Sequence, residues 1–230
     1  MMTKSDKSKT LYLIISVIIC AVAMCFVDSV IKPQYFVKSI IKLCLFLIVP
    51  CVYFVINKSQ QIIIKMLFGF NSKSFITSIC LGIISYTAIV VGYFLLKKSF
   101  DFSTIAEKLT ENAGVSANNF LYVSLYISFV NSFLEEIFFR GFTFILLRNL
   151  TSKRFAYLFS ALLFAIYHTG MMVGYYGFGV LLLTISGLFA AGMMFNFLNE
   201  RSKNIFTSWF VHMFANFGIN TVGFILFGMI

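Results

Sequence analysis

Long apolar runs, separated by short polar or basic segments, follow one another along most of this chain. A membrane-spanning helix needs about 20 mostly apolar residues, and the runs reach or approach that length. The pattern therefore predicts spanning helices at residues 11–31, 40–56, 75–96, 120–147, 155–168, 178–198 and 205–230. Since the last run is either one helix or two helices divided near Gly218, we expect seven or eight spans.

The segments between these runs are expected to form interfacial helices, short surface helices and turns. We expect Lys42, at the start of the second run, to snorkel toward the membrane interface, and the amphipathic segment 58–73 to lie at that interface. The remaining connections are a polar stretch with a short surface helix at 97–119, a glycine-rich break at 170–179 and a polar turn at 200–204.

Composition supports a membrane protein. The chain is 60% hydrophobic and 11% charged, whereas soluble domains contain about 45–50% apolar residues. The expected fold class is all-α, a polytopic helical bundle whose helices enclose an intramembrane polar site. The first run is too long for the apolar core of a cleavable signal peptide, so none is expected.

Basic residues give the chain a formal net charge of +10, but they lie mostly between the apolar runs. That placement favours anionic lipid as the partner and argues against nucleic acid. With the N-terminus inside, the inside segments carry 11 lysines and arginines and the outside segments carry 6. Because cytoplasmic loops are enriched in these residues, we expect a multi-pass protein of the cell membrane with a cytoplasmic N-terminus.

Ionisable and amide side chains interrupt three of the apolar runs. Glu135, Glu136 and Arg140 lie in one run, His168 in another, and His212 with Asn216 in the last. Ionisable groups inside a membrane are costly and usually functional. Their recurrence in three runs therefore predicts one polar site assembled between helices, rather than packing contacts alone.

Helical spacing suggests different roles for the two adjacent glutamates. Glu136 and Arg140 are four residues apart, so they share a face and can pair. Glu135 is rotated by about 100° and stays available. A carboxylate in a dry pocket can act as a general base, so Glu135 with His168 is the expected pair that activates water.

His212 and Asn216 are also four residues apart and therefore share a face. An imidazole and a carboxamide each offer an N–H donor, and two fixed donors suit a developing oxyanion. This set of groups predicts a hydrolase without a side-chain nucleophile.

Other interpretations of the same residues stay open. Glu135, His168 and His212 match the ligand set of a catalytic zinc site, although no His-Glu-x-x-His motif is present. Intramembrane Glu and His also occur in the proton relays of transporters, but the chain shows no inverted repeat.

Three motifs in order, Glu-Glu-x-x-x-Arg, Phe-x-x-x-His and His-x-x-x-Asn, carry a family resemblance over about residues 121–220. The chain resembles the CAAX-protease and bacteriocin-processing (CPBP or Abi) family of intramembrane proteases, which includes the type II CAAX prenyl endopeptidases. The resemblance implies a protease core at 120–230 behind N-terminal helices at 1–119. It also implies a site within the membrane that opens toward the cytosol.

Carried over residue by residue, the family pattern makes Glu135 the base that activates water. Arg140 and His168 complete the first two motifs, and His212 and Asn216 become the oxyanion partners. Asn220, one turn beyond Asn216, is a supporting residue. A metal-free mechanism is implied for the prenyl proteases, so no cofactor is expected, and zinc remains the alternative.

The resemblance also suggests substrates. The expected one is a peptide or protein with a membrane-associated or prenylated segment, and in bacteria the role would be peptide or bacteriocin processing or self-immunity. The alternative is a non-proteolytic membrane scaffold or immunity protein that acts by binding.

Overall fold

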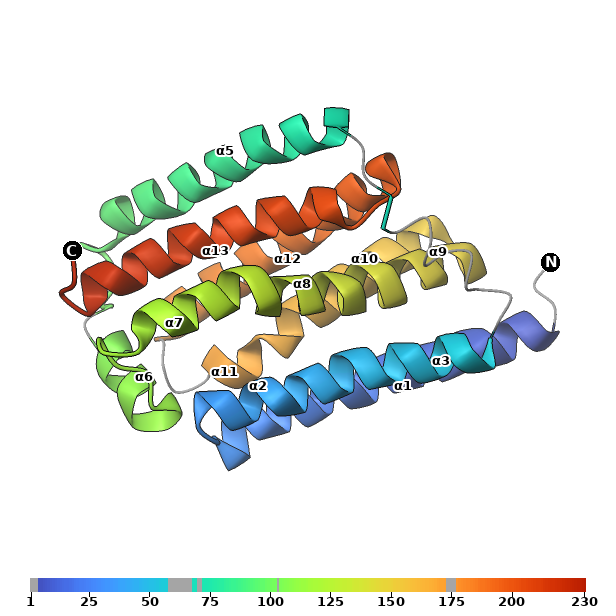
Figure 1. Ribbon diagram of the computed structural model, residues 1–230, viewed down its shortest axis with the longest axis horizontal. Helices are drawn as coiled ribbons and strands as arrows, with labels where there is room; N and C mark the ends of the chain where they lie inside the picture. The colour runs from blue at the N-terminus through green and yellow to red at the C-terminus, as the bar shows by residue number, and fades with distance from the viewer. Residues whose placement is uncertain (1–3, 58–67, 70–71, 103, 173–176) are drawn as a thin grey trace.

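Seven long apolar helices lie roughly along a common axis in a computed structural model that describes residues 4–57, 68–69, 72–102, 104–172 and 177–230 (Figure 1). No described residue lies in a β-strand. The helices that are long and apolar enough to cross a membrane are Asp6–Ile31, Tyr35–Ile56, Lys73–Leu96, Phe120–Leu150, Lys153–Met172, Phe178–Ser202 and Phe206–Leu226. The prediction of an all-α multi-pass membrane protein is therefore confirmed, with seven spans among the described residues. The last run forms one helix.

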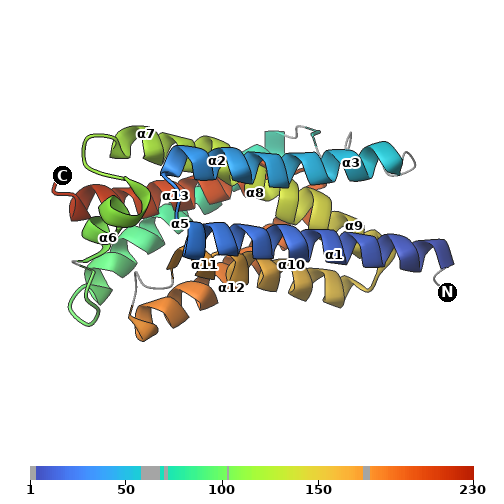
Figure 2. The same ribbon diagram turned by 90° about the horizontal axis from the view of Figure 1, so that it is seen from below.

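The first two spans form an N-terminal hairpin along one side of the bundle (Figures 1 and 2). Helix α1 (Lys4–Phe26) ends in a π-helical turn, and the chain reverses at Lys32, whose φ of 45° is left-handed. Helix α2 (Tyr35–Leu43) then continues through the π-helical segment Cys44–Ile48 into α3 (Val49–Ile56).

The fourth span is one continuous helix, here called the α7–α9 helix. It comprises α7 (Phe120–Leu125), the π-helical Tyr126–Asn131, α8 (Ser132–Glu135), the π-helical Glu136–Ile145 and α9 (Leu146–Leu150). Around it lie α10 (Lys153–Tyr167), α11 (Thr169–Met172), α12 (Phe178–Ser202) and α13 (Phe206–Leu226). Helix α5 (Ser72–Leu96) packs along the outside of α13 (Figure 1).

Aromatic packing joins the N-terminal hairpin to the rest of the bundle. Phe46 stacks on Phe138 with ring centroids 4.1 Å apart and meets Tyr167 at 5.5 Å. Such pairs contribute about 0.5–1.5 kcal/mol each beyond their buried area. Farther along, a Cβ on Gly170 would lie 2.7 Å from Cα of Cys25, so only glycine permits this approach of α1 to α11. The hairpin is therefore packed directly against the helices that carry the polar residues.

The connections differ in part from their predictions. The short surface helix is present as α6 (Thr104–Ala113). The polar turn expected at 200–204 is wrong in extent, because α12 continues through Ser202. Glu200 is held within that helix by Arg148 at 2.6 Å and Lys153 at 2.8 Å. The glycine-rich break expected at 170–179 is wrong in extent, because residues 170–172 belong to α11 and residues 178–179 to α12, while residues 173–176 lie outside the described residues. Most of segment 58–73 also lies outside the described residues, so its position at the interface stays a prediction.

Candidate active site

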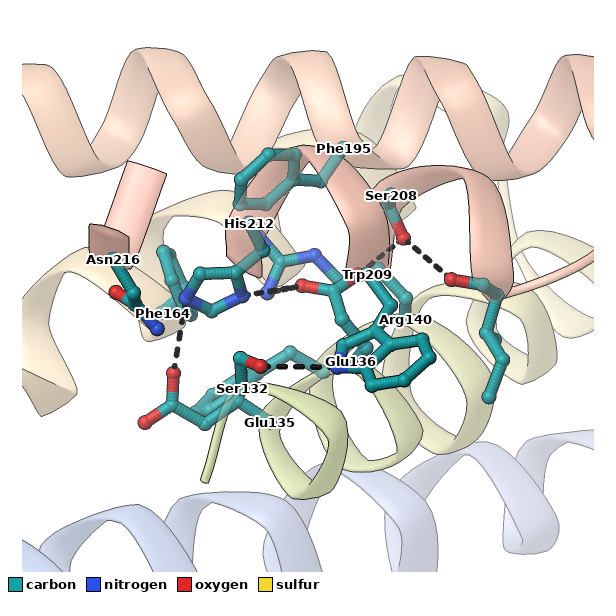
Figure 3. A network of polar contacts seen from close by, with 12 residues as sticks. Ser132, Glu135, Glu136, Arg140, Phe164, Phe195, Ser208, Trp209, His212 and Asn216 are labelled. Carbon is teal, nitrogen blue, oxygen red and sulfur yellow. Dashed lines mark hydrogen bonds and ion pairs between the residues drawn. The ribbon is translucent and has the colours of Figure 1, made fainter. Parts of the chain in front are cut away.

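Glu135 and Glu136 lie midway along the α7–α9 helix and are both fully buried. Successive residues of a helix point about 100° apart, so the two carboxylates leave it in different directions (Figure 3). Each therefore meets a different set of partners.

Glu136 is surrounded by donors, mostly from α13 (Figure 3). Its Oε1 lies 3.0 Å from Nδ1 of His212 and 3.5 Å from Nη1 of Arg140, and its Oε2 accepts the hydroxyl of Ser208. The expected pairing of Glu136 with Arg140 is thus present. Ser208 was not predicted, although it lies one helical turn before His212 in the same four-residue spacing as Asn216.

Glu135 divides its two oxygens between different environments. Oε1 receives Nζ of Lys42 at 2.5 Å, Nδ2 of Asn131 at 3.1 Å and the hydroxyl of Tyr167 at 3.4 Å. Oε2 has no hydrogen-bond partner among the described residues. It lies 3.8 Å from Nε2 of His168 and 3.6 Å from Nε2 of His212. The structure therefore brings the predicted base and both histidines together around one carboxylate oxygen.

The partners of the two imidazoles fix which nitrogen faces Glu135. Nδ1 of His168 lies 2.7 Å from the carbonyl oxygen of Phe164, and Nδ1 of His212 faces the carboxylate of Glu136. Both partners only accept hydrogen bonds, so each Nδ1 carries the proton. In the neutral ring each Nε2 then presents a lone pair toward Glu135. His212 can donate from Nε2 only after taking up a proton there.

Arg140 is completely buried and is held mainly by aromatic rings. Its guanidinium carbon lies 4.1 Å from the ring centroid of Phe164 and 4.9 Å from that of Phe195. Phe195 in turn stacks on the ring of His212 at 5.1 Å. Buried cation–π contacts are worth about 2 kcal/mol. Arg140 thereby contacts both the Glu136 carboxylate and the rings of Phe164 and Phe195.

The two asparagines of α13 have different surroundings. Asn216 donates one hydrogen bond from Nδ2 to the carbonyl oxygen of Ile127 at 3.1 Å, and its amide keeps a second N–H. Asn220 donates to the carbonyl oxygen of Ser124 and to the hydroxyl of Ser128, both at 3.0 Å. Asn216 lies beside His212 (Figure 3), whereas Asn220 fastens α13 to the start of the α7–α9 helix.

The prediction that Lys42 snorkels to the membrane interface is wrong. The second span begins at Tyr35 rather than near residue 40, so Lys42 lies about two turns inside it. Its side chain is buried, with Nζ bonded to Glu135 and to Asn131. A buried carboxylate needs a countercharge, and Lys42 provides it. Because the sequence pattern placed the start of this helix near residue 40, it did not predict that Lys42 is buried in the site.

The predicted zinc ligands Glu135, His168 and His212 converge, but their surroundings do not suit a metal ion. No group of three or more His, Cys, Asp and Glu side chains within the described ranges has an arrangement that could hold one. The ammonium of Lys42, 2.5 Å from Oε1 of the same glutamate, would repel a divalent cation. The donor set therefore fits a neutral hydrogen-bonding molecule better than zinc.

Fold and site together define a multi-pass helical membrane protein that buries carboxylates and imidazoles of the kind used in hydrolysis. Residues 117–218 match the family model described as Type II CAAX prenyl endopeptidase Rce1-like. This part of the chain is therefore similar to a family of CAAX-type proteases, as its three motifs indicated. No curated protein and no solved structure gives a match to the chain. The N-terminal hairpin lies outside the matched residues.

Proposed function

We propose that the protein is an intramembrane endopeptidase that uses Glu135 to activate a water molecule for attack on a peptide bond. The convergence of two imidazole nitrogens on the free oxygen of Glu135, at 3.6 and 3.8 Å, carries this proposal. These separations are too long for direct hydrogen bonds but place all three atoms within reach of one water molecule.

The reaction would proceed in two steps. Oε2 of Glu135 takes a proton from the water while the water oxygen bonds to the carbonyl carbon, and Nε2 of His168 accepts the second hydrogen bond of that water. The carbonyl oxygen becomes an oxyanion. As the C–N bond breaks, Glu135 returns the proton to the leaving nitrogen.

His212 and Asn216 would stabilise the oxyanion. His212 must carry a proton on Nε2 to donate, and the carboxylate of Glu136, 3.0 Å from its Nδ1, stabilises the resulting imidazolium. The second N–H of Asn216 is the other donor. Arg140 and Asn220 support these groups without meeting the substrate.

The mechanism needs no metal, because Glu135 supplies the base and Lys42 already neutralises it. We expect cleavage by the purified protein to persist after dialysis against a strong chelator, and zinc analysis to give far less than one ion per chain. Loss of activity on chelation, restored by zinc alone, would contradict the metal-free mechanism.

We propose a membrane-associated peptide or protein as the substrate, since the site is buried between spanning helices. The family description favours a prenylated C-terminal segment. A bacterial host would use the same reaction for peptide or bacteriocin processing, or for self-immunity. We place the protein in the cell membrane with a cytoplasmic N-terminus. Burial of Lys42 lowers the outside count of basic residues from 6 to 5, against 11 inside.

The experiment compares membrane peptides from cells that carry the wild-type protein, Glu135→Gln or Glu200→Gln. Glu200→Gln is the matched control, because Glu200 is also paired with basic residues but lies near one end of α12. Product peptides should disappear, and their precursors accumulate, only in Glu135→Gln.

Unchanged peptides in Glu135→Gln at equal protein levels would overturn the proposal. If that variant still protected cells from a bacteriocin as well as the wild type does, the binding function would be favoured instead.

A further inference from the structure

A lysine from outside the family-matched residues reaches the centre of the site. Lys42 lies on α2 of the N-terminal hairpin, and its Nζ is 2.5 Å from Oε1 of Glu135 on α8. The family match begins at residue 117. The protease core of this chain is therefore completed by a side chain that its own motifs do not contain.

The contacts of Lys42 are arranged around this one carboxylate. Its ammonium also bonds the side-chain oxygen of Asn131, whose amide nitrogen donates to the same Oε1. The rings of Phe46 and Tyr167 lie 5.6 and 5.0 Å from Nζ. Asn131, Tyr167 and Lys42 thus all donate hydrogen bonds to Oε1, whereas Oε2 faces the two histidines.

Charge balance gives Lys42 a second role at the same place. The buried site holds two carboxylates, Glu135 and Glu136, and one family-motif cation, Arg140, which lies on the Glu136 side. Without Lys42 one buried negative charge would have no close countercharge, which is strongly unfavourable. The neighbouring Lys38 does not substitute, because it pairs with the buried Asp28 at 2.5 Å.

We propose that Lys42 is a positioning residue for Glu135, supplied by the N-terminal hairpin. It holds Oε1 and the negative charge, so that Oε2 faces the water-binding side of the site. The inference rests on the proposed function for its catalytic consequence, while the contact itself can be tested without cleavage.

The first test measures cleavage by the full-length protein in detergent micelles, with an internally quenched, farnesylated CAAX-type peptide as the probe. Lys42→Met should lower kcat about 100-fold with KM changed by no more than about twofold, because misplaced catalytic groups cost about that factor. Lys42→Arg keeps the charge and should recover at least a tenth of wild-type kcat.

Lys38→Met is the matched control. It removes a partly exposed lysine on the same helix, one turn away, and also breaks an ion pair with the buried Asp28. It should lose thermal stability as Lys42→Met does, but the folded protein should keep kcat within about twofold of the wild type. An equal loss of kcat in Lys42→Met and Lys38→Met would show that Lys42 has only a structural role, and it would overturn the proposal.

The second test is a stability cycle that needs no substrate. Lys42→Met should lower Tm by about 10 °C, since it strands a buried carboxylate. Adding Glu135→Gln should restore most of that loss without restoring cleavage. Additive losses in the double variant would overturn the inference, whether or not the wild type cleaves the probe.

Failure of the proposed function has a different signature. In that case neither the wild type nor Lys38→Met cleaves the probe, while the stability coupling of Lys42 with Glu135 persists.

Discussion

The two adjacent glutamates of the site have contrasting surroundings. Glu136 gives both oxygens to donors, from His212, Ser208 and Arg140. Glu135 gives one oxygen to donors and leaves the other facing two imidazole nitrogens. A fully engaged carboxylate orients its neighbours, whereas a half-engaged one can still accept a proton. Because both acids are equally buried, burial does not distinguish them, and the difference between them is the unoccupied oxygen of Glu135.

The two glutamates also differ in which parts of the chain supply their partners. All partners of Glu136 lie within the family-matched residues 117–218, whereas Glu135 depends in addition on Lys42 of the N-terminal hairpin. The surroundings of Glu136 are therefore built entirely from the family-matched residues. The surroundings of Glu135, the proposed base, are completed by a residue outside them.

After the loss of all cleavage expected for Glu135→Gln, the next largest effect is expected for Glu136→Gln. The amide cannot hold the His212 tautomer or stabilise its imidazolium, so kcat should fall about 1,000-fold while some cleavage remains. Arg140 also loses its countercharge, and the free energy of unfolding should fall by about 3–5 kcal/mol. The measurements are kcat with the farnesylated peptide and thermal unfolding in micelles. Unchanged kcat and unchanged stability would contradict the assigned role.

A smaller effect is expected from the asparagines of α13. Asn216→Ala should lower kcat about 100-fold, the usual cost of one oxyanion donor. Asn220→Ala, one turn farther along, should cost about 1–3 kcal/mol of stability through the unpaired polar groups that it leaves. Its kcat should stay within about threefold of the wild type. The same kinetic assay checks both variants, and a larger kcat loss in Asn220→Ala would show that the oxyanion donor is misassigned.

Much of this arrangement follows from sequence patterns. The apolar runs predict the spans, because length and hydropathy alone decide whether a helix can cross a membrane. The i, i+4 spacing predicts the Glu136–Arg140 pair and the shared face of His212 and Asn216, because helix geometry fixes which side chains are neighbours.

Contacts between distant runs were not predictable in the same way. Lys42 and Glu135 are 93 positions apart, and no local spacing relates them. The true start of α2 at Tyr35 would have shown that Lys42 lies too deep to snorkel. Ser208 was within reach of the sequence, because it continues the four-residue spacing of His212 and Asn216 by one turn. The division of the oxygens of Glu135 depends on three helices at once, and only the folded structure defines it.

The most direct measurement of the central claim compares single-turnover cleavage of the farnesylated peptide by Glu135→Gln and Glu136→Gln, at equal amounts of folded protein. We expect no cleavage by Glu135→Gln above the uncatalysed rate, and slow but measurable cleavage by Glu136→Gln. Measurable cleavage by Glu135→Gln together with none by Glu136→Gln would exchange the two roles and contradict that claim.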